Sequence, residues 1–147
     1  MTTWKKLAII AGTMAGAALA GAPAEAGGFT AANVRGAYGY TLTGTVGDPA
    51  TSYVESGRIV ADGRGNLTAE GTAVVGGVTV LSISYVCTYA VSPTGILSAD
   101  CTSGRSQSKF VGPIFDSGLE ARYVALPQPG QPTSLVGYAR RQSLRPF

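Results

Sequence analysis

The segment YVCTYAVSPTGILSADC, residues 85–101, constrains the fold of this chain most, because a tight turn lies midway between the chain's two cysteines. Pro93 suits the second position of a type I turn, and Gly95 suits the left-handed residue that follows it. This three-residue loop places Cys87 and Cys101 directly opposite each other on antiparallel strands, at a non-hydrogen-bonded position with Cα atoms about 4.5 Å apart. The spacing therefore predicts a cross-strand disulfide.

The register of this hairpin also divides its side chains between two faces, since successive residues of a strand point to opposite sides of a sheet. Ser82, Ser84 and Asp100 share a small, polar face. The other face is apolar, carries the disulfide, and comprises Leu81, Ile83, Tyr85, Cys87, Tyr89 and Val91 with Leu97, Ala99 and Cys101. We expect one buried side and one solvated side.

Short alternating runs rich in Gly, Thr, Val, Tyr and Ser continue along the chain, separated by turn signals, a pattern typical of an all-β sandwich or barrel. We expect eight strands, at residues 36–46, 52–62, 66–75, 79–91, 96–104, 107–115, 118–126 and 133–141. Every connection between them is short enough for a hairpin. The sequence therefore predicts a soluble, antiparallel, up-and-down β-barrel of eight strands, which leaves no exposed sheet edge.

The segment IVADGRGNLTAEG, residues 59–71, is the most motif-like part of the chain. A calcium loop of the EF-hand type spreads more oxygen ligands over a longer loop, and a phosphate-binding loop precedes a helix, whereas an alternating strand follows here. A three-residue turn explains the residues better: Gly65 takes the left-handed conformation, and Asp62 pairs with Asn66 and closes the turn through its carboxylate. We expect a hairpin turn and no metal site.

The N-terminus predicts export. MTTWKK is a short basic stretch, residues 7–22 are apolar but too short for a membrane span, and AEA at residues 24–26 has the small residues of a cleavage site. The mature protein is then secreted or periplasmic. The expected parts are a secretory signal peptide over residues 1–26, an N-terminal arm over 27–35, the barrel over 36–142 and a C-terminal tail over 143–147.

The composition excludes several classes of function. The chain has no His, which rules out Ser-His-Asp and Cys-His catalysis and His-ligated metals. Its formal net charge is +3, and loss of Lys5, Lys6 and Glu25 with the signal peptide lowers this to +2, too weak and dispersed for nucleic-acid binding. Exported proteins retain disulfides, and this chain has no His that could activate a thiol. Cys87 and Cys101 are therefore expected to be structural. No cofactor is expected.

An exported barrel invites comparison with outer-membrane barrels, which turn a continuous apolar face outward and line the lumen with polar residues. Here the branched and aromatic face carries the disulfide, and the opposite face is polar. Pro146, Arg140, Arg141 and Arg145 do not suit a membrane-spanning last strand. We expect no membrane insertion.

Three segments carry a resemblance: GAYGYTLTG (residues 36–44), GRIVADGRGNLT (57–68) and VGYARRQ (136–142). They resemble an uncharacterised family of exported bacterial domains with a Gly-x-Tyr opening, an Asp-Gly-x-Gly-Asn turn and an Arg-Gln ending, whose motifs are structural. The chain is also faintly similar to lipocalin-type (calycin) barrels, which open with Gly-x-Trp and pack a late Arg over that Trp. In that likeness Tyr38 replaces the Trp, Arg140 or Arg141 supplies the Arg, and the implied activity is ligand binding.

The leading functional hypothesis is a binding protein for a small apolar or aromatic ligand, since eight-stranded barrels are either filled by side chains or hold one small ligand. Small residues accompany the tyrosines on the inner face. They either leave a cavity or simply make room for the rings, and the sequence leaves both alternatives open. The candidate ligand-binding residues are Tyr38, Tyr40, Tyr53, Tyr85 and Tyr89.

Two other hypotheses belong to different classes. The segment GGFTAANVRG, residues 27–36, is a flexible lead-in with which a secreted interaction module or inhibitor would plug an exported protein. Alternatively, Glu55, on the same face as Tyr53, would be the catalytic residue of a cavity-shaping isomerase or cyclase, with tyrosines as acid–base partners. Because charged side chains are rarely buried, we expect instead that Glu55 lies at the barrel edge and reaches solvent. Binding is therefore favoured over catalysis.

Overall fold

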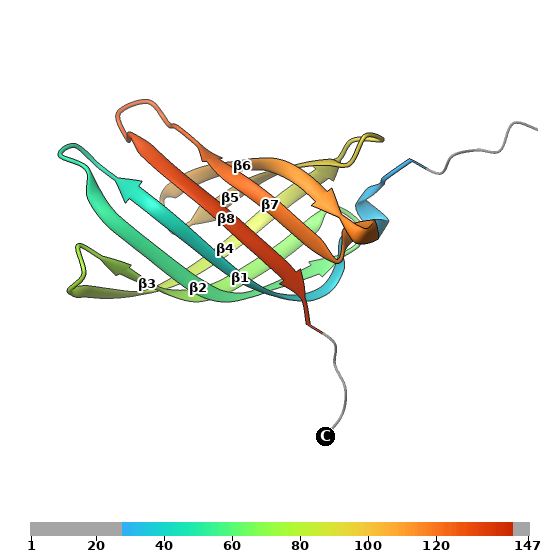
Figure 1. The fold of residues 1–147 in the computed structure, drawn as a ribbon, viewed down its shortest axis with the longest axis horizontal. Helices are drawn as coiled ribbons and strands as arrows, with labels where there is room; N and C mark the ends of the chain where they lie inside the picture. The colour runs from blue at the N-terminus through green and yellow to red at the C-terminus, as the bar shows by residue number, and fades with distance from the viewer. Residues whose placement is uncertain (1–27, 143–147) are drawn as a thin grey trace, which may run out of the picture.

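The computed structural model describes residues 28–142 and confirms an all-β fold, a closed barrel of eight antiparallel strands in sequence order (Figure 1). The elements are η1 (Ala31–Asn33), β1 (Arg35–Val46), β2 (Thr51–Asp62), β3 (Asn66–Val75), β4 (Thr79–Val91), β5 (Ile96–Ser103), β6 (Ser106–Phe115), η2 (Asp116–Gly118), β7 (Glu120–Leu126) and β8 (Thr133–Arg141). The expected signal peptide (1–26) and C-terminal tail (143–147) lie outside the described residues. Among the described residues, no helix is long and apolar enough to cross a membrane.

The strand boundaries follow the prediction closely, and the largest difference is at β7, which begins at Glu120 instead of residue 118. The segment before it forms the 3-10 helix η2. Asp116, Ser117 and Gly118 all have positive φ, at 49°, 56° and 90°. A strand requires extended backbone, so β7 starts only after these left-handed residues.

The hairpin between β4 and β5 forms as the sequence predicts. The Gly95 amide donates to the Ser92 carbonyl over 2.9 Å, and the Ser92 amide donates to the Ile96 carbonyl over 2.9 Å. Cys87 lies opposite Cys101 and is bonded to it, with Cα atoms 4.0 Å apart. Both cysteines are buried. The predicted disulfide is confirmed, and with it the assignment of the apolar face to the barrel interior.

The DGRGN segment is a turn, also as predicted. Asp62 Oδ1 accepts hydrogen bonds from the amides of Arg64 (2.6 Å) and Asn66 (3.0 Å), while Oδ2 accepts one from the Asn66 side chain (2.7 Å). These hydrogen bonds lower the pKa of Asp62 to about 2, and the bond from the Asn66 side chain contributes most. Gly65 has a φ of 102°, the left-handed conformation expected for this loop.

Closure of the barrel depends on β1, which pairs with β2 on one side and with β8 on the other. Inward side chains form two buried clusters. The larger contains Val34, which follows η1, together with the disulfide. The smaller lies further along the interior and comprises Leu42, Tyr53, Ala73 and Leu135. The candidate site lies where the two clusters meet.

Residues 28–34 close one end of the barrel. The Phe29 ring packs against the larger cluster, and η1 follows it. The Tyr89 hydroxyl donates to the carbonyl of Val34 (2.7 Å) and approaches that of Ala31 (3.1 Å). Figure 1 shows this segment in blue against the barrel end, beside η2. Residues 28–34, which the sequence analysis assigned to an N-terminal arm, thus place Phe29 and Val34 against the apolar interior of the barrel.

Candidate functional site

Glu55 lies near the middle of β2 and points into the barrel, on the same side as Tyr53 and Ile59. Its exposed fraction is 0%. The expectation that Glu55 reaches solvent at the barrel edge is therefore wrong. The physical reason is its position: β1 and β3 flank it on both sides, opposite Leu42 and Ala73, so an inward side chain at this depth lies far from either rim.

Three tyrosine hydroxyls meet the Glu55 carboxylate. Tyr40, from β1, donates to Oε1. Tyr53, from β2, donates to Oε2 over 2.5 Å, and Tyr85, from β4, donates to the same oxygen over 3.2 Å. Hydrogen bonds to a carboxylate are roughly twice as strong as those between neutral groups, and they offset part of the cost of burying it. We refer to Glu55, Tyr40, Tyr53 and Tyr85 as the Glu55 cluster.

Glycines give the cluster its space. Gly57 and Gly71 face each other across β2 and β3, on the inward side. A Cβ on Gly71 would lie 2.6 Å from the Tyr40 hydroxyl oxygen, closer than van der Waals contact allows. Glycine at this position therefore lets the Tyr40 phenol reach Glu55. At this level of the barrel, small inward residues make room for tyrosine rings, one of the two alternatives that the sequence left open.

The small inward residues also leave an empty space, which was the second alternative. A cavity of about 80 Å³ adjoins the Glu55 cluster. Its wall is aliphatic and aromatic, with the disulfide on one side. Of the described residues that line it, Glu55 is the only charged one. The interior is thus partly filled and partly hollow. The accessible surface of the hollow part is apolar, and the fully buried Glu55 carboxylate lies behind it, covered by its phenol partners.

Two aromatic residues of this cavity were not among the sequence candidates: Phe110 from β6 and Tyr123 from β7. The Phe110 ring is perpendicular to that of Tyr85, with centroids 6.3 Å apart, and to that of Tyr123, with centroids 5.7 Å apart. The alternation of EARYVAL, residues 120–126, could have identified Tyr123 as an inward residue, because it places Tyr123 on the same side as Ala121 and Ala125.

The tyrosines of the site are held in their protonated form. Burial, followed by the hydrogen bond to Glu55, raises the pKa of Tyr40 and Tyr53 far above the usual value. Burial, followed by the charge of Glu55, raises the pKa of Tyr85 to about 12 and that of Tyr123 still further. These phenols are hydrogen-bond donors at neutral pH, and they are poorly matched to proton transfer there.

The five candidate tyrosines divide by position. Tyr40 and Tyr85 belong to the cluster and line the cavity, whereas Tyr53 reaches Glu55 from the smaller buried cluster. The Tyr38 ring also lines the cavity, but its hydroxyl donates to the Gly118 carbonyl over 2.8 Å. The hydroxyl of Tyr89 is likewise used at the closed end, on the carbonyl of Val34. Two of the five hydroxyls therefore hold the barrel end together.

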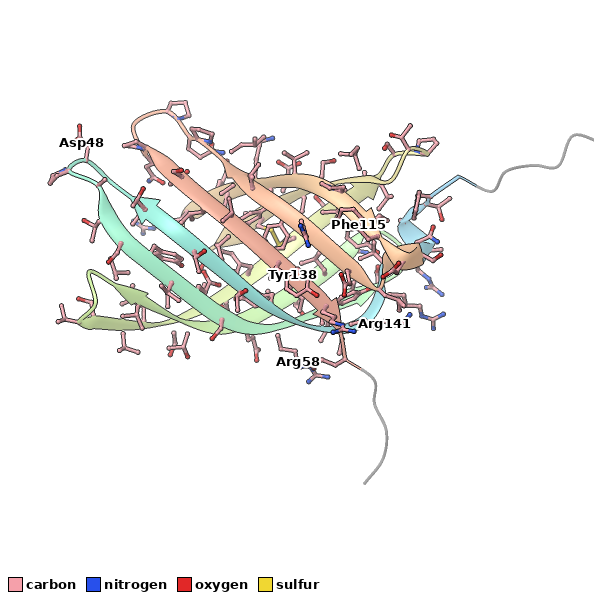
Figure 2. All side chains as sticks on the ribbon, in the orientation of Figure 1. Asp48, Arg58, Phe115, Tyr138 and Arg141 are labelled. Carbon is pink, nitrogen blue, oxygen red and sulfur yellow. A yellow bond between two sulfur atoms is a disulfide. The ribbon has the colours of Figure 1, made fainter. Side chains whose placement is uncertain are left out.

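At that end of the barrel, the two arginines considered in the sequence analysis, Arg140 and Arg141, point to opposite sides of the sheet. Arg141 pairs with Tyr38 across β8 and β1, and Figure 2 shows it at the end of β8. Arg140 points to the other side of the sheet and forms a 3.3 Å ion pair with Glu120. The arginine that faces Tyr38 is thus Arg141.

The arrangement offers hydrogen-bond acceptance and negative charge more than metal coordination. Within residues 28–142, no group of three or more His, Cys, Asp or Glu side chains is placed to hold a metal ion. No family model matches the chain, and no curated protein or solved structure matches it. The fold and site by themselves define the class: a small, eight-stranded, up-and-down barrel with a carboxylate–phenol cluster beside an internal cavity.

Proposed function

We propose that this protein binds a small, largely apolar ligand inside its barrel. The observation that carries the proposal is the cavity of about 80 Å³ next to the fully buried Glu55. Ligand sites are typically concave and mostly apolar, with a few polar groups that fix orientation. The Glu55 cluster supplies such polar groups directly behind the apolar surface of this wall.

The cavity volume limits the ligand. An engineered cavity of about 150 Å³ in another protein accepts benzene. A cavity of about 80 Å³ therefore suits a molecule with fewer atoms than a benzene ring, and an aromatic ligand would have to displace Phe110 or Tyr123. The proposal includes export, with which the Cys87–Cys101 disulfide is compatible, since such bonds persist in oxidising compartments.

Native mass spectrometry of protein purified from its own host tests this function, together with thermal shifts over a panel of small apolar and aromatic compounds. Ala99→Leu would fill the cavity from β5, and we expect it to abolish any shift. Ala90→Leu adds the same atoms on the exposed side of β4 and is the matched control. No retained ligand and no shift over the panel would contradict binding.

One observation favours a second candidate, an isomerase or cyclase: Glu55 is the charged residue among the described residues that line the cavity, and a substrate would reach its carboxylate by displacing the phenols that cover it. A Glu55→Gln variant should then stop conversion of the bound compound. Chromatography of the ligand before and after incubation with the protein measures this conversion. Recovery of the unchanged compound from the wild-type protein would leave binding as the sole function.

A further inference from the structure

Glu55 is a buried carboxylate with no ion-pair partner in the described part of the chain. The ion pairs there join Lys109 to Asp100 and Arg140 to Glu120, both near the surface. The groups that contact Glu55 are neutral phenols. A buried charge is costly unless it is paired, so an opposite charge entering the cavity would be favoured.

Aromatic rings surround the same space. Tyr85, Phe110 and Tyr123 line the cavity, and the rings of neighbouring pairs stand at 86° and 85° to each other. The faces of aromatic rings carry negative electrostatic potential and attract cations, above all organic ammonium groups. Aromatic rings in the cavity wall, with a buried carboxylate behind them, form a combination that recognises such groups.

The rest of the wall determines which kind of cation fits. Hard cations such as calcium require about six or more oxygen ligands. Beyond the Glu55 cluster this cavity offers aliphatic and aromatic side chains and the disulfide, which would leave such an ion poorly coordinated. Methyl groups on nitrogen, in contrast, find apolar contacts there.

We propose that the cavity takes a small alkylammonium ion, with its methyl groups against Tyr85, Phe110 and Tyr123 and its charge balancing that of the Glu55 carboxylate, which lies behind the apolar wall. The inference rests on the proposed ligand-binding function and names the ligand class. The volume of about 80 Å³ fits an ion the size of a methylated ammonium. A neutral molecule of the same shape would fill the cavity and leave the carboxylate without a counter-charge.

Isothermal titration calorimetry with tetramethylammonium chloride and with tert-butanol tests the inference, because the two molecules share shape and number of non-hydrogen atoms but differ in charge. We expect the wild-type protein to bind the cation at least tenfold more tightly than the alcohol, at one site. Equal binding, or tighter binding of tert-butanol, would overturn the cation inference and leave the binding function standing. Absence of binding for both probes and for the apolar panel would overturn both.

Two variants make the test specific. Glu55→Gln keeps the side-chain shape and should lower tetramethylammonium affinity at least tenfold, with tert-butanol affinity changed less than twofold. Phe110→Leu removes a ring without touching the carboxylate and should lower cation affinity by a smaller factor. Glu70→Gln removes a carboxylate from the exposed side of β3 and is the matched control. Unchanged cation affinity in the Glu55 variant would overturn the conclusion that the carboxylate attracts the cation. Unchanged cation affinity in the Phe110 variant would overturn the conclusion that the aromatic rings contribute to its binding.

Discussion

The hydroxyl of Tyr53 donates a 2.5 Å hydrogen bond to Oε2 of Glu55, two residues further along the same strand. Side chains two residues apart share a face of a strand, so both enter the interior together. Tyr53 packs in the smaller buried cluster, whereas Glu55 lines the cavity. The carboxylate therefore divides the interior between a packed part and a hollow part, and its hydrogen bonds should matter for stability as well as for binding.

Glu55→Gln should destabilise the fold by about 2–3 kcal/mol, because it replaces charge-assisted hydrogen bonds with neutral ones and turns an amide donor toward phenol donors. Urea unfolding followed by circular dichroism measures the change. Glu70→Gln, on the exposed side of β3, should alter stability by less than about 0.5 kcal/mol. Equal losses in the two variants would contradict a special contribution of the buried carboxylate.

Stability should fall at alkaline pH. The pKa of Tyr85 is raised from 10.0 to about 12 by burial and then by the charge of Glu55. Since its pKa is higher in the folded state than in the unfolded state, this contribution is fully present below pH 10 and is lost as the pH rises through about 12. Urea unfolding at a series of pH values measures this, and Tyr85→Phe should flatten the decline. Parallel pH profiles for the two proteins would contradict it.

Gly71→Ala should destabilise the barrel by about 1–3 kcal/mol, because the added methyl group would collide with the Tyr40 hydroxyl and with the backbone of β2. Thermal unfolding gives the loss. Gly39→Ala, on the outward side of β1, is the matched control: the nearest atom to its added methyl group would belong to the flexible Gln142 side chain, at 3.2 Å. A stable Gly71 variant would show that Tyr40 does not need this space.

Tyr89→Phe should loosen the closed end of the barrel. The variant loses the hydrogen bonds to the carbonyls of Val34 and Ala31, at a cost of about 1–2 kcal/mol. Hydrogen exchange of residues 29–34 should accelerate more than exchange in β3, and mass spectrometry of peptides resolves the two. Tyr138→Phe, on the outward side of β8, serves as the control. Unchanged exchange at residues 29–34 would show that packing of Phe29 alone holds the segment.

Reduction of the Cys87–Cys101 disulfide should lower stability without abolishing the fold. The bond closes a loop of about 15 residues, for which the chain-entropy model gives about 3 kcal/mol; the turn already favours the hairpin in the unfolded state, so we expect nearer 2 kcal/mol. Thermal unfolding with and without reductant measures the loss. A Cys87→Ala, Cys101→Ala double variant should have the same stability as the reduced protein, and reductant should not change that stability. Two free thiols in the exported protein would contradict the bond.

The sequence by itself determined the strands and the register of the hairpins. Turn residues act locally: Gly95 and Gly65 each fix a loop whose geometry pairs the neighbouring residues, and Cys87 and Cys101 meet as the β4–β5 register requires. Alternation then assigns every residue of a hairpin to one face. The direction of Glu55 into the barrel follows from the same rule.

Only the tertiary structure decided that Glu55 is fully buried and which groups surround it. Tyr40 and Tyr85 lie 15 and 30 residues away in sequence, on strands that bring them to the carboxylate once the barrel forms. Phe110 and Tyr123 join the same cavity from the other side, and residues 28–34 close the end. Local propensities carry no information on such distances across the interior. Burial depends on what the closed barrel places on every side of a residue, and that is settled when all eight strands are in place.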